Sequence, residues 1–357
     1  MEEKSIERKS CYERWLEQEG LPVIQDFYIE DVRKVPLERW ERKGGFGVYL
    51  NLIGTGNIND AYICEIPPGK SLKPERHLIE EMIYVATGRG ATTIWQDGGK
   101  KQTFEWQEGS LFSPPLNTWR QHFNGSGDTP ARLLAVTSAP VVMNLFHNLE
   151  FVFNTPFSFS DRYDSQEGYF SGKGESYSKR VWETNFVPDV RGFPLKEWRE
   201  RGAGGKNIMF ELSDNTMAAH ISEFPVGTYK KAHRHGPGAH VIIIAGKGYS
   251  LMWPEGSPMQ RFDWQEGSII VPPERWFHQH FNAGATPARY LALRWGSKKN
   301  RFLKQFKVDE SVKAGGDQIE YEDEDPVVRQ MFEEALRKVG IESRMGAYHH
   351  QKQAVSA

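Results

Sequence analysis

The segment DVRKVPLERWERKGG, residues 31–45, returns as DVRGFPLKEWRERGA at residues 189–203, an offset of 158 positions (189 − 31 = 158). The same offset relates further matched positions in the two halves, namely Trp40/Trp198, Gly69/Gly227, His77/His235, Gly88/Gly246, Trp95/Trp253, Trp106/Trp264, Gly109/Gly267 and Asn124/Asn282. Self-similarity at a fixed offset indicates two copies of one structural unit. We therefore expect the two halves to fold alike.

Each half has the pattern of β-structure. Short apolar runs end at Pro or Gly, as in AYICEIPPG (61–69) and AAHISEFPVG (218–227). The runs at 82–95 and 241–253 each predict two strands broken at a Gly-x-Gly turn. Many short strands with frequent turns favour a sandwich or barrel. Helices are expected only at the margins, over 10–19 and after Asp325, where Pro326 occupies a first helical position.

Length and composition exclude several classes of protein. A chain of 357 residues fits two domains, and its net charge of −2 comes without a basic stripe, so no nucleic-acid partner is expected. Two cysteines, Cys11 and Cys64, cannot form a disulfide framework and fit a reducing compartment. The charged start MEEKSIERKS is no secretory signal, and no apolar run reaches membrane-spanning length. We expect a cytoplasmic protein with no membrane partner.

Three histidines of the second half have metal-ligand spacing. His233 and His235 are two residues apart, so on a strand both imidazoles face the same side. The block GSIIVPPERWFHQHFN, residues 267–282, supplies His278. Neutral imidazoles suit iron, zinc, copper or nickel, so the residue types alone do not choose the metal.

These two blocks resemble the paired motifs of the cupin superfamily, Gly-x5-His-x-His-x3,4-Glu-x6-Gly and Gly-x5-Pro-x-Gly-x2-His-x3-Asn, although Arg275 replaces the last Gly of the second motif. The resemblance covers roughly 31–140 and 189–297. It implies an all-β bicupin with two tandem double-stranded β-helix (jelly-roll) barrels and peripheral helices at the termini. The expected domains are an N-terminal barrel with a degenerate metal site (1–140) and a connector (141–184). A metal-binding C-terminal barrel (185–300) and an extension with a helix (301–357) follow.

The motif position of the usual glutamate ligand holds Ala239, which leaves three histidines and no carboxylate. A site of this kind resembles the gentisate 1,2-dioxygenase group and its salicylate and hydroxynaphthoate relatives. By that resemblance His233, His235 and His278 bind Fe(II), with open positions for substrate and O2; Mn, Ni and Zn remain alternatives. The gentisate group has its metal in the first barrel, so the resemblance here is to the other half. His240 stays open as a fourth ligand, although strand alternation turns it outward when Ala239 faces inward.

The first half lacks the histidine trio. At the matching positions it carries Glu75, His77, Glu81 and Arg120. A guanidinium in place of the third imidazole repels a cation and can pair with Glu75 or Glu81. We interpret this as a former metal site filled by an ion pair, with a Glu-His-Glu metal site as the alternative.

Four further residues are candidates for the site. His280 is a candidate catalytic acid or base, but its counterpart His122 persists in the other half, which equally fits a structural, hydrogen-bonded role. Substrate contact is predicted for Arg275, Trp276 and Arg294, because the first half has other residue types, Asn117, Thr118 and Thr137, at these positions. An arginine can hold a substrate carboxylate in a bidentate pair, and the alternative for each is a surface or rim charge.

The leading functional hypothesis is a non-haem Fe(II) dioxygenase, an oxidoreductase that cleaves a C–C bond of a small aromatic or enolic substrate. Three neutral ligands leave the metal more positive, which favours an anionic, bidentate substrate. Two alternatives are a Mn, Zn or Ni lyase, isomerase or decarboxylase, and a non-catalytic small-molecule-binding bicupin. The expected partners are the small-molecule substrate and O2, and we expect a homo-oligomer.

Overall fold

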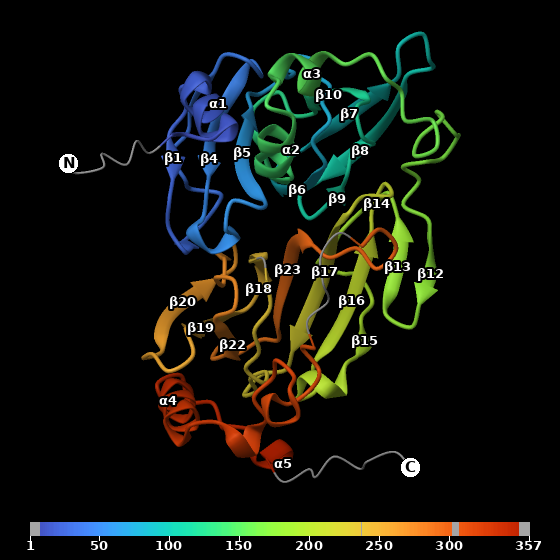
Figure 1. Ribbon diagram of the computed structural model, residues 1–357. Helices are drawn as coiled ribbons and strands as arrows, with labels where there is room; N and C mark the ends of the chain where they lie inside the picture. Colours follow the sequence, from blue (N-terminus) through green and yellow to red (C-terminus); the bar gives the residue numbers. More distant parts are fainter. Residues whose placement is uncertain (1–7, 237, 302–306, 350–357) are drawn as a thin grey trace, which may run out of the picture.

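The computed structural model describes residues 8–236, 238–301 and 307–349, and it places the two halves of the chain one above the other (Figure 1). The upper half contains a large sheet in the order β1-β4-β5-β11-β6-β9, with β3 on β4, and a smaller sheet in the order β10-β7-β8. Its strands are β1 (Val23–Ile24), β3 (Glu38–Trp40), β4 (Gly45–Leu50), β5 (Asp60–Ile66), β6 (Glu81–Thr87), β7 (Arg89–Trp95), β8 (Gln102–Gln107), β9 (Leu111–Phe112), β10 (Trp119–Asn124) and β11 (Ala131–Thr137).

The lower half repeats this plan. Its large sheet runs β12-β13-β16-β17-β23-β18-β21, with β15 on β16, and its small sheet runs β20-β19-β22. The strands are β12 (Gly174–Ser178), β13 (Val181–Thr184), β15 (Lys196–Glu197), β16 (Lys206–Glu211), β17 (Met217–Phe224), β18 (His240–Ala245), β19 (Lys247–Trp253), β20 (Gln260–Gln265), β21 (Ile269–Ile270), β22 (Phe277–Asn282) and β23 (Ala288–Trp295). The expected all-β fold of two similar jelly-roll barrels is confirmed.

The repeat holds at the level of single strand pairs. In the first barrel Leu133 of β11 lies opposite Cys64 of β5. In the second barrel Tyr290 of β23 lies opposite Ser222 of β17, at the matching place. Equivalent positions in the two barrels can therefore be compared residue by residue.

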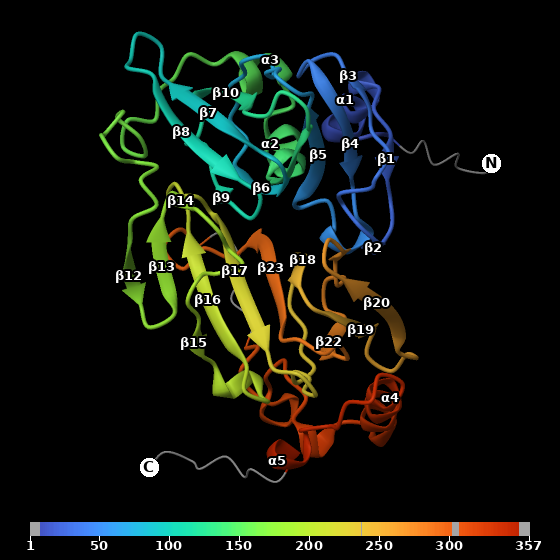
Figure 2. The ribbon, with the colours of Figure 1, turned by 180° about the vertical axis from the view of Figure 1, so that it is seen from behind.

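Each barrel also receives a strand from the other half of the chain, which the sequence did not reveal. The short strand β14 (Phe186–Val187) pairs with β9 of the first barrel, and β2 (Tyr28–Ile29) pairs with β21 of the second. Figure 2 shows β14 beside β9, and β2 at the junction above β20. The predicted boundaries at 140 and 185 therefore do not separate the two barrels as independent sheets.

The repeated DVR segments hold these exchanged strands in place. The Val32 amide donates to the Gly267 carbonyl at 2.9 Å, and the Val190 amide donates to the Gly109 carbonyl at the same distance. Arg33 and Arg191 each add a 2.8 Å hydrogen bond to a backbone carbonyl of the other half. The two contacts are equivalents within the repeat, and together they fasten each half to the other.

Gly109 and Gly267 are required at these contacts for two reasons. Their φ angles are +90° and +93°, a region that side chains with a Cβ rarely adopt. A Cβ at either position would also collide with the carboxylate of the DVR aspartate, Asp189 or Asp31. The glycines shared by both halves thus admit the close approach of the other half.

Two predicted helices are confirmed. α1 (Cys11–Glu19) begins at a capping box in which Ser10 and Glu13 exchange side-chain hydrogen bonds, and α4 (Pro326–Arg337) begins after the Asp325 cap. The shortest helical segments, of three or four residues, are η1 (Ile53–Thr55), η2 (Arg199–Arg201), η3 (Val312–Ala314), η4 (Tyr321–Asp323) and α5 (Gly346–His349). In the described part of the chain, none of the helices combines the length and apolar character needed to cross a membrane.

The expectation of helices only at the margins was wrong. α2 (Ala139–Phe146) and α3 (Leu149–Asn154) lie in the middle of the chain and cover the first barrel beside α1 (Figure 1). The Tyr12 amide donates to the Asn144 side chain at 2.9 Å, and the rings of Trp15 and Phe153 stack at 6.0 Å. The predicted connector therefore closes one end of the first barrel.

Candidate metal centre

The structure brings the three predicted ligands of the second barrel together. One ligand atom from each of His233, His235 and His278 lies within 4.8 Å of the other two. The ring centroids are 4.1 Å apart for His233 and His278, 4.8 Å for His235 and His278, and 5.3 Å for His233 and His235. This spacing allows a single cation to contact all three rings.

The backbone around His233 is less regular than a strand. His233 belongs to no strand. It forms one isolated bridge with Gln318 and one with His278 on β22, and with His278 it exchanges hydrogen bonds of 3.1 Å and 2.8 Å. His233 and His235 therefore face the same side, as strand alternation predicted, although this segment is not a strand. The bridge fixes His233 against β22, and His235 follows from the loop.

All three imidazoles are neutral in this environment. Burial lowers the pKa of His278 to about 3. Burial, followed by the nearby Arg201 guanidinium, holds the pKa of His233 well below its ordinary value, and burial and His278 do the same for His235. Neutral imidazole is the form that binds a metal.

Hydrogen bonds assign the free nitrogen of two rings. Nδ1 of His278 lies 3.3 Å from the Trp276 carbonyl, to which it donates, and this leaves Nε2 with the lone pair. On His233, Nδ1 accepts from Arg201 Nη2 at 2.5 Å. A neutral imidazole has one nitrogen lone pair available to accept a hydrogen bond or to bind a metal. On His233 that lone pair accepts the hydrogen bond from Arg201, so a metal ion would have to displace Arg201.

His240 does not join the trio. Ala239 lines the cavity, as predicted, and His240 faces away from it toward the first barrel, where Nδ1 lies 3.2 Å from the Asn59 amide nitrogen. The ring is 0 % exposed, so it lies at the contact between barrels rather than at the surface. Burial lowers its pKa to about 3.

In the first barrel the matching positions form an ion-pair cluster. Ligand atoms of Glu75, His77 and Glu81 also lie within 4.8 Å of one another, but Arg120 lies among them, 2.9 Å from Glu81 and in contact with His77. Burial opposes ionisation of Glu81, yet Arg120 and the other cations lower its pKa to about 2. The acids are charged and paired within the protein, so a guanidinium occupies the place of a metal.

Two more cations balance the cluster. Arg42 pairs with Glu75 at 2.7 Å, and Lys43 pairs with the same carboxylate and lies 3.2 Å from the Tyr62 hydroxyl. The first-barrel cavity that remains has a volume of about 20 Å³, room for about one water molecule. A substrate does not fit there.

The second-barrel cavity is larger and adjoins the histidine trio. Its volume is about 120 Å³, space on the order of ten water molecules. Three cationic side chains line it, Arg201, Arg294 and Lys298, and among the described residues no carboxylate does. Nε of Arg294 and Nε1 of Trp198 are buried donors without a protein partner. Unsatisfied donors and net positive charge are features that favour the binding of an anion with several acceptor oxygens.

His280 lines this cavity, and hydrogen bonds on the side away from the cavity fix the orientation of its ring. Its Nδ1 is 2.7 Å from Ser250 Oγ, which accepts from Trp264 Nε1 at 3.0 Å. Among the described residues the Ser250 hydroxyl has no other acceptor, so its proton goes to Nδ1 and the His280 ring carries its proton on Nε2. The first barrel has the same arrangement in His122, with Thr92 and Trp106. Its presence in both barrels identifies the arrangement as part of the shared scaffold.

Two predicted substrate contacts lie outside the cavity. Arg275 is half exposed and pairs with Asp317 at 3.2 Å, and Trp276 packs on Phe27, with ring centroids 5.8 Å apart. Arg275 has a φ of +65° and its counterpart Asn117 has +56°, which explains why the cupin motif has Gly at this position. The first half has other residue types at the positions of Arg275 and Trp276 because its turn and its local packing differ. Arg294, by contrast, lines the cavity as predicted.

Sequence reasoning missed four residues around the cavity: Arg201, Lys298, Lys230 and Tyr290. For two of them the repeat held a usable signal. Lys230 and Tyr290 match Leu72 and Leu133 of the first half, so the half with the histidine trio alone carries polar groups there. Arg201 matches Lys43, a cation in both halves, and gave no such contrast.

Comparison with known proteins agrees with the two-barrel fold. Residues 62–137 match the family model described as a cupin domain. A structure of Bacillus subtilis oxalate decarboxylase, from a study of its Mn(II) centres, matches with a TM-score of 0.51 and 16% identity over 78% of this chain and 79% of that chain. Lactobacillus farciminis oxalate decarboxylase in its formate complex matches with a TM-score of 0.51 and 15% identity over 76% and 87%. No curated protein matches the sequence.

Fold and comparisons together define the architecture: two jelly-roll barrels in one chain, the bicupin fold, with a match to the cupin domain model over residues 62–137 of the first barrel. At 15–16% identity the likeness to oxalate decarboxylases shows the fold alone. The dioxygenase hypothesis has no support from these comparisons.

Proposed function

We propose that the protein is a metal-dependent bicupin lyase that decarboxylates a small carboxylate in its second barrel. The observation that carries the proposal is the pairing of three neutral imidazoles with a cavity rich in cations and unpartnered N–H groups. The oxalate decarboxylase structures support the decarboxylase alternative better than the dioxygenase hypothesis.

The histidine trio fits a divalent cation that displaces Arg201 from the lone pair of His233. Its rings converge, their pKa values keep them neutral, and His278 is oriented by its bond to the Trp276 carbonyl. We propose Mn(II) as the first candidate, because the B. subtilis relative has Mn(II) centres, and Fe(II), Ni and Zn as alternatives that imidazole ligands also suit. A cation bound here would supply Lewis-acid polarisation of a substrate oxygen.

The cavity side chains fit a carboxylate. Arg294 has a buried Nε without a protein partner, and its Nη1 donates to the Trp295 carbonyl at 2.9 Å, so the guanidinium is fixed in position. Lys298 adds a second positive charge at the wall. His280 presents Nε2–H as a neutral donor, because burial and His278 hold its pKa well below the ordinary value. These groups bind and orient an anion while the barrel excludes bulk water.

The test is product analysis with defined metals. Purified protein is loaded with Mn(II) or Fe(II) and supplied with oxalate, other small carboxylates or gentisate, with and without O2. The proposal predicts CO2 release from a small carboxylate. Consumption of O2 in proportion to ring cleavage, without CO2 release, would support the dioxygenase hypothesis instead. Absence of turnover together with tight carboxylate binding would support the non-catalytic alternative.

A matched pair of arginine variants tests the substrate site. Arg294→Met is expected to raise KM for the carboxylate about ten- to hundredfold, since a hydrogen bond to a charged group contributes about 1.5–3 kcal/mol. Arg275→Met, outside the cavity, is expected to leave KM unchanged. Equal effects of the two variants contradict the placement of the substrate.

A further inference from the structure

A buried lysine and tyrosine form a polar pair behind the cavity. Nζ of Lys230 donates to the Tyr290 hydroxyl at 3.2 Å and to Ser222 Oγ. Lys230 is 2% exposed and Tyr290 6%, and Tyr290 lines the cavity. Burial lowers the pKa of Lys230, and the Tyr290 hydroxyl beside it opposes that lowering. Burying an ammonium group is costly, so the fold keeps this lysine against a free-energy penalty.

The first barrel provides an internal control for this pair. The backbone contacts match, because the Leu72 amide donates to the His122 carbonyl as the Lys230 amide donates to the His280 carbonyl. Yet the side chains at the three positions there are Leu72, Leu133 and Cys64, all apolar. The barrel scaffold therefore does not need polar side chains at these three positions. Only the second barrel, which has the metal-ligand histidines, carries them, as Lys230, Tyr290 and Ser222.

The surroundings of the Tyr290 hydroxyl are cationic or neutral. The groups that face it are Lys230, Arg201, Ser222, His220 and His280, with ring distances of 5.9 Å to His220 and 5.2 Å to His280. Burial alone would raise the pKa of Tyr290, but Lys230, Ser222 and Arg201 together lower it. For other tyrosines of the chain, such as Tyr84 and Tyr249, burial raises the pKa of the hydroxyl.

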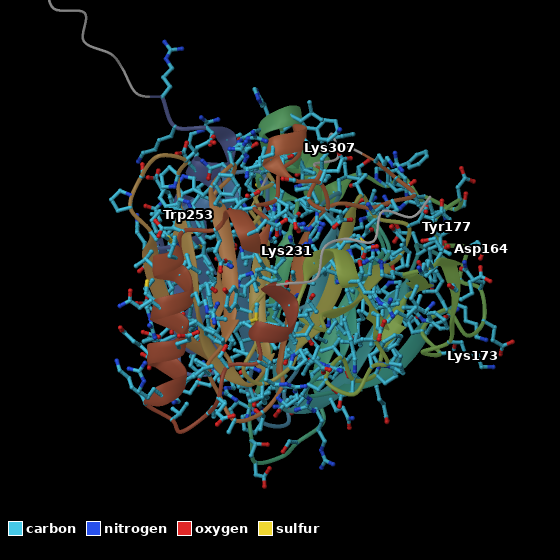
Figure 3. All side chains as sticks on the ribbon, turned by 90° about the horizontal axis from the view of Figure 1, so that it is seen from below. Asp164, Lys173, Tyr177, Lys231, Trp253 and Lys307 are labelled. Atoms are coloured by element: carbon cyan, nitrogen blue, oxygen red, sulfur yellow. The ribbon has the colours of Figure 1, made fainter. Side chains whose placement is uncertain are left out.

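The lysine next in sequence shows that the inward position is specific. Lys231 pairs with Glu320 of the C-terminal extension at 2.5 Å. In Figure 3 it is labelled among the orange and red segments of that extension. The two adjacent lysines therefore point to opposite sides of the barrel wall. Lys231 contacts the C-terminal extension, and Lys230 contacts Tyr290 at the cavity.

We infer that Tyr290 is the catalytic proton donor of the second-barrel cavity and that Lys230 is its positioning residue. The inference rests on the proposed decarboxylation. The C–C bond to the leaving carboxylate breaks and CO2 departs. The electron pair left on carbon takes the proton of the Tyr290 hydroxyl, forming a C–H bond. Lys230 stabilises the phenolate until solvent returns a proton, so for oxalate the balance is hydrogen oxalate to formate and CO2.

The first test needs no substrate. Ultraviolet pH titration of the purified full chain is expected to show one tyrosine ionising below about pH 10, the ordinary pKa of tyrosine. This component disappears in Tyr290→Phe and moves to higher pH in Lys230→Met. The control Lys247→Met, at an exposed lysine of β19, leaves it unchanged. Superimposed curves for wild type and Tyr290→Phe overturn the inference whatever the activity.

The second test uses the Mn(II)-loaded protein with oxalate. Tyr290→Phe is expected to lower kcat about 10²- to 10⁴-fold with little change in KM, the range of a lost general acid. Lys230→Met is expected to shift the alkaline limb of the kcat–pH profile upward, whereas a purely structural lysine would leave its position unchanged. If wild type releases CO2 and Tyr290→Phe does so at the same rate, the inference fails and the proposed function stands. If wild type releases none, the proposed function fails, and the titration still decides whether the pair exists.

Discussion

At the scale of single residues, Arg201 and a metal compete for His233. The guanidinium donates to Nδ1 of a ring that has one lone pair while neutral. Arg201→Met is expected to tighten Mn(II) binding about ten- to hundredfold, because a hydrogen bond to a charged group contributes about 1.5–3 kcal/mol. Chelator competition with Mn(II) measures the change. Arg199→Met, at an exposed arginine two residues earlier, is the control, and a weaker affinity in Arg201→Met contradicts the competition.

His240 gives a pH prediction that is independent of any metal ligand. Its pKa in the folded protein is about 3 because of burial, against about 6.5 in an unfolded chain. Between these values the unfolded state binds a proton that the folded state does not, so the free energy of unfolding falls as pH drops through this window and recovers above it.

His240→Asn is therefore expected to flatten that loss by up to about 1.4 kcal/mol per pH unit. Urea unfolding of metal-free protein across the window measures it. His147→Asn, at an exposed position with φ of +52° that Asn tolerates, should keep the wild-type slope. Parallel curves for wild type and His240→Asn contradict the assignment.

Residue types and spacing predicted the histidine trio and the replacement by Arg120 because ligands must share a face. They wrongly predicted Arg275 and Trp276 as cavity residues. A residue type found in only one repeat can also result from turn geometry or local packing, as it does at these two positions. Arg201 was missed because its position depends on η2, which precedes the motifs and has no periodic signal of its own.

At the scale of elements, the DVR segments join the barrels and should carry measurable stability. Arg33→Ala and Arg191→Ala are each expected to cost about 1–3 kcal/mol, since each leaves a backbone carbonyl and an aspartate short of a partner. Arg39→Ala, in an exposed pair with Glu41, is expected to cost less than either of these, because solvent screens an exposed pair. Denaturant unfolding compares the three, and equal losses contradict a joining role.

The strands could be predicted from the sequence wherever they were long and repeated, as β5 and β17 were. The exchanged strands β2 and β14 could not, because two residues have no periodicity and their partners lie in the other half of the chain. The repeated DVR motif was visible in the sequence, but its partner, the Gly109 or Gly267 turn of the opposite barrel, is a tertiary contact.

At the scale of the whole molecule, strand exchange makes the barrels one folding unit. A continuous buried core runs through both, with Ile63 and Leu134 in the same cluster as Ile221 and Leu291. Calorimetry is therefore expected to show one transition with equal calorimetric and van't Hoff enthalpies. Two resolved transitions would mean that each barrel folds without the strand it receives.

The division of labour between barrels is tested most directly by counting bound metal. After reconstitution with Mn(II) and removal of excess, elemental analysis should find one equivalent per chain. His278→Ala should lose it, whereas Glu81→Gln, in the ion-pair cluster of the first barrel, should retain it. Two equivalents in wild type, or a metal that is lost with Glu81→Gln and kept with His278→Ala, would contradict a single centre in the second barrel.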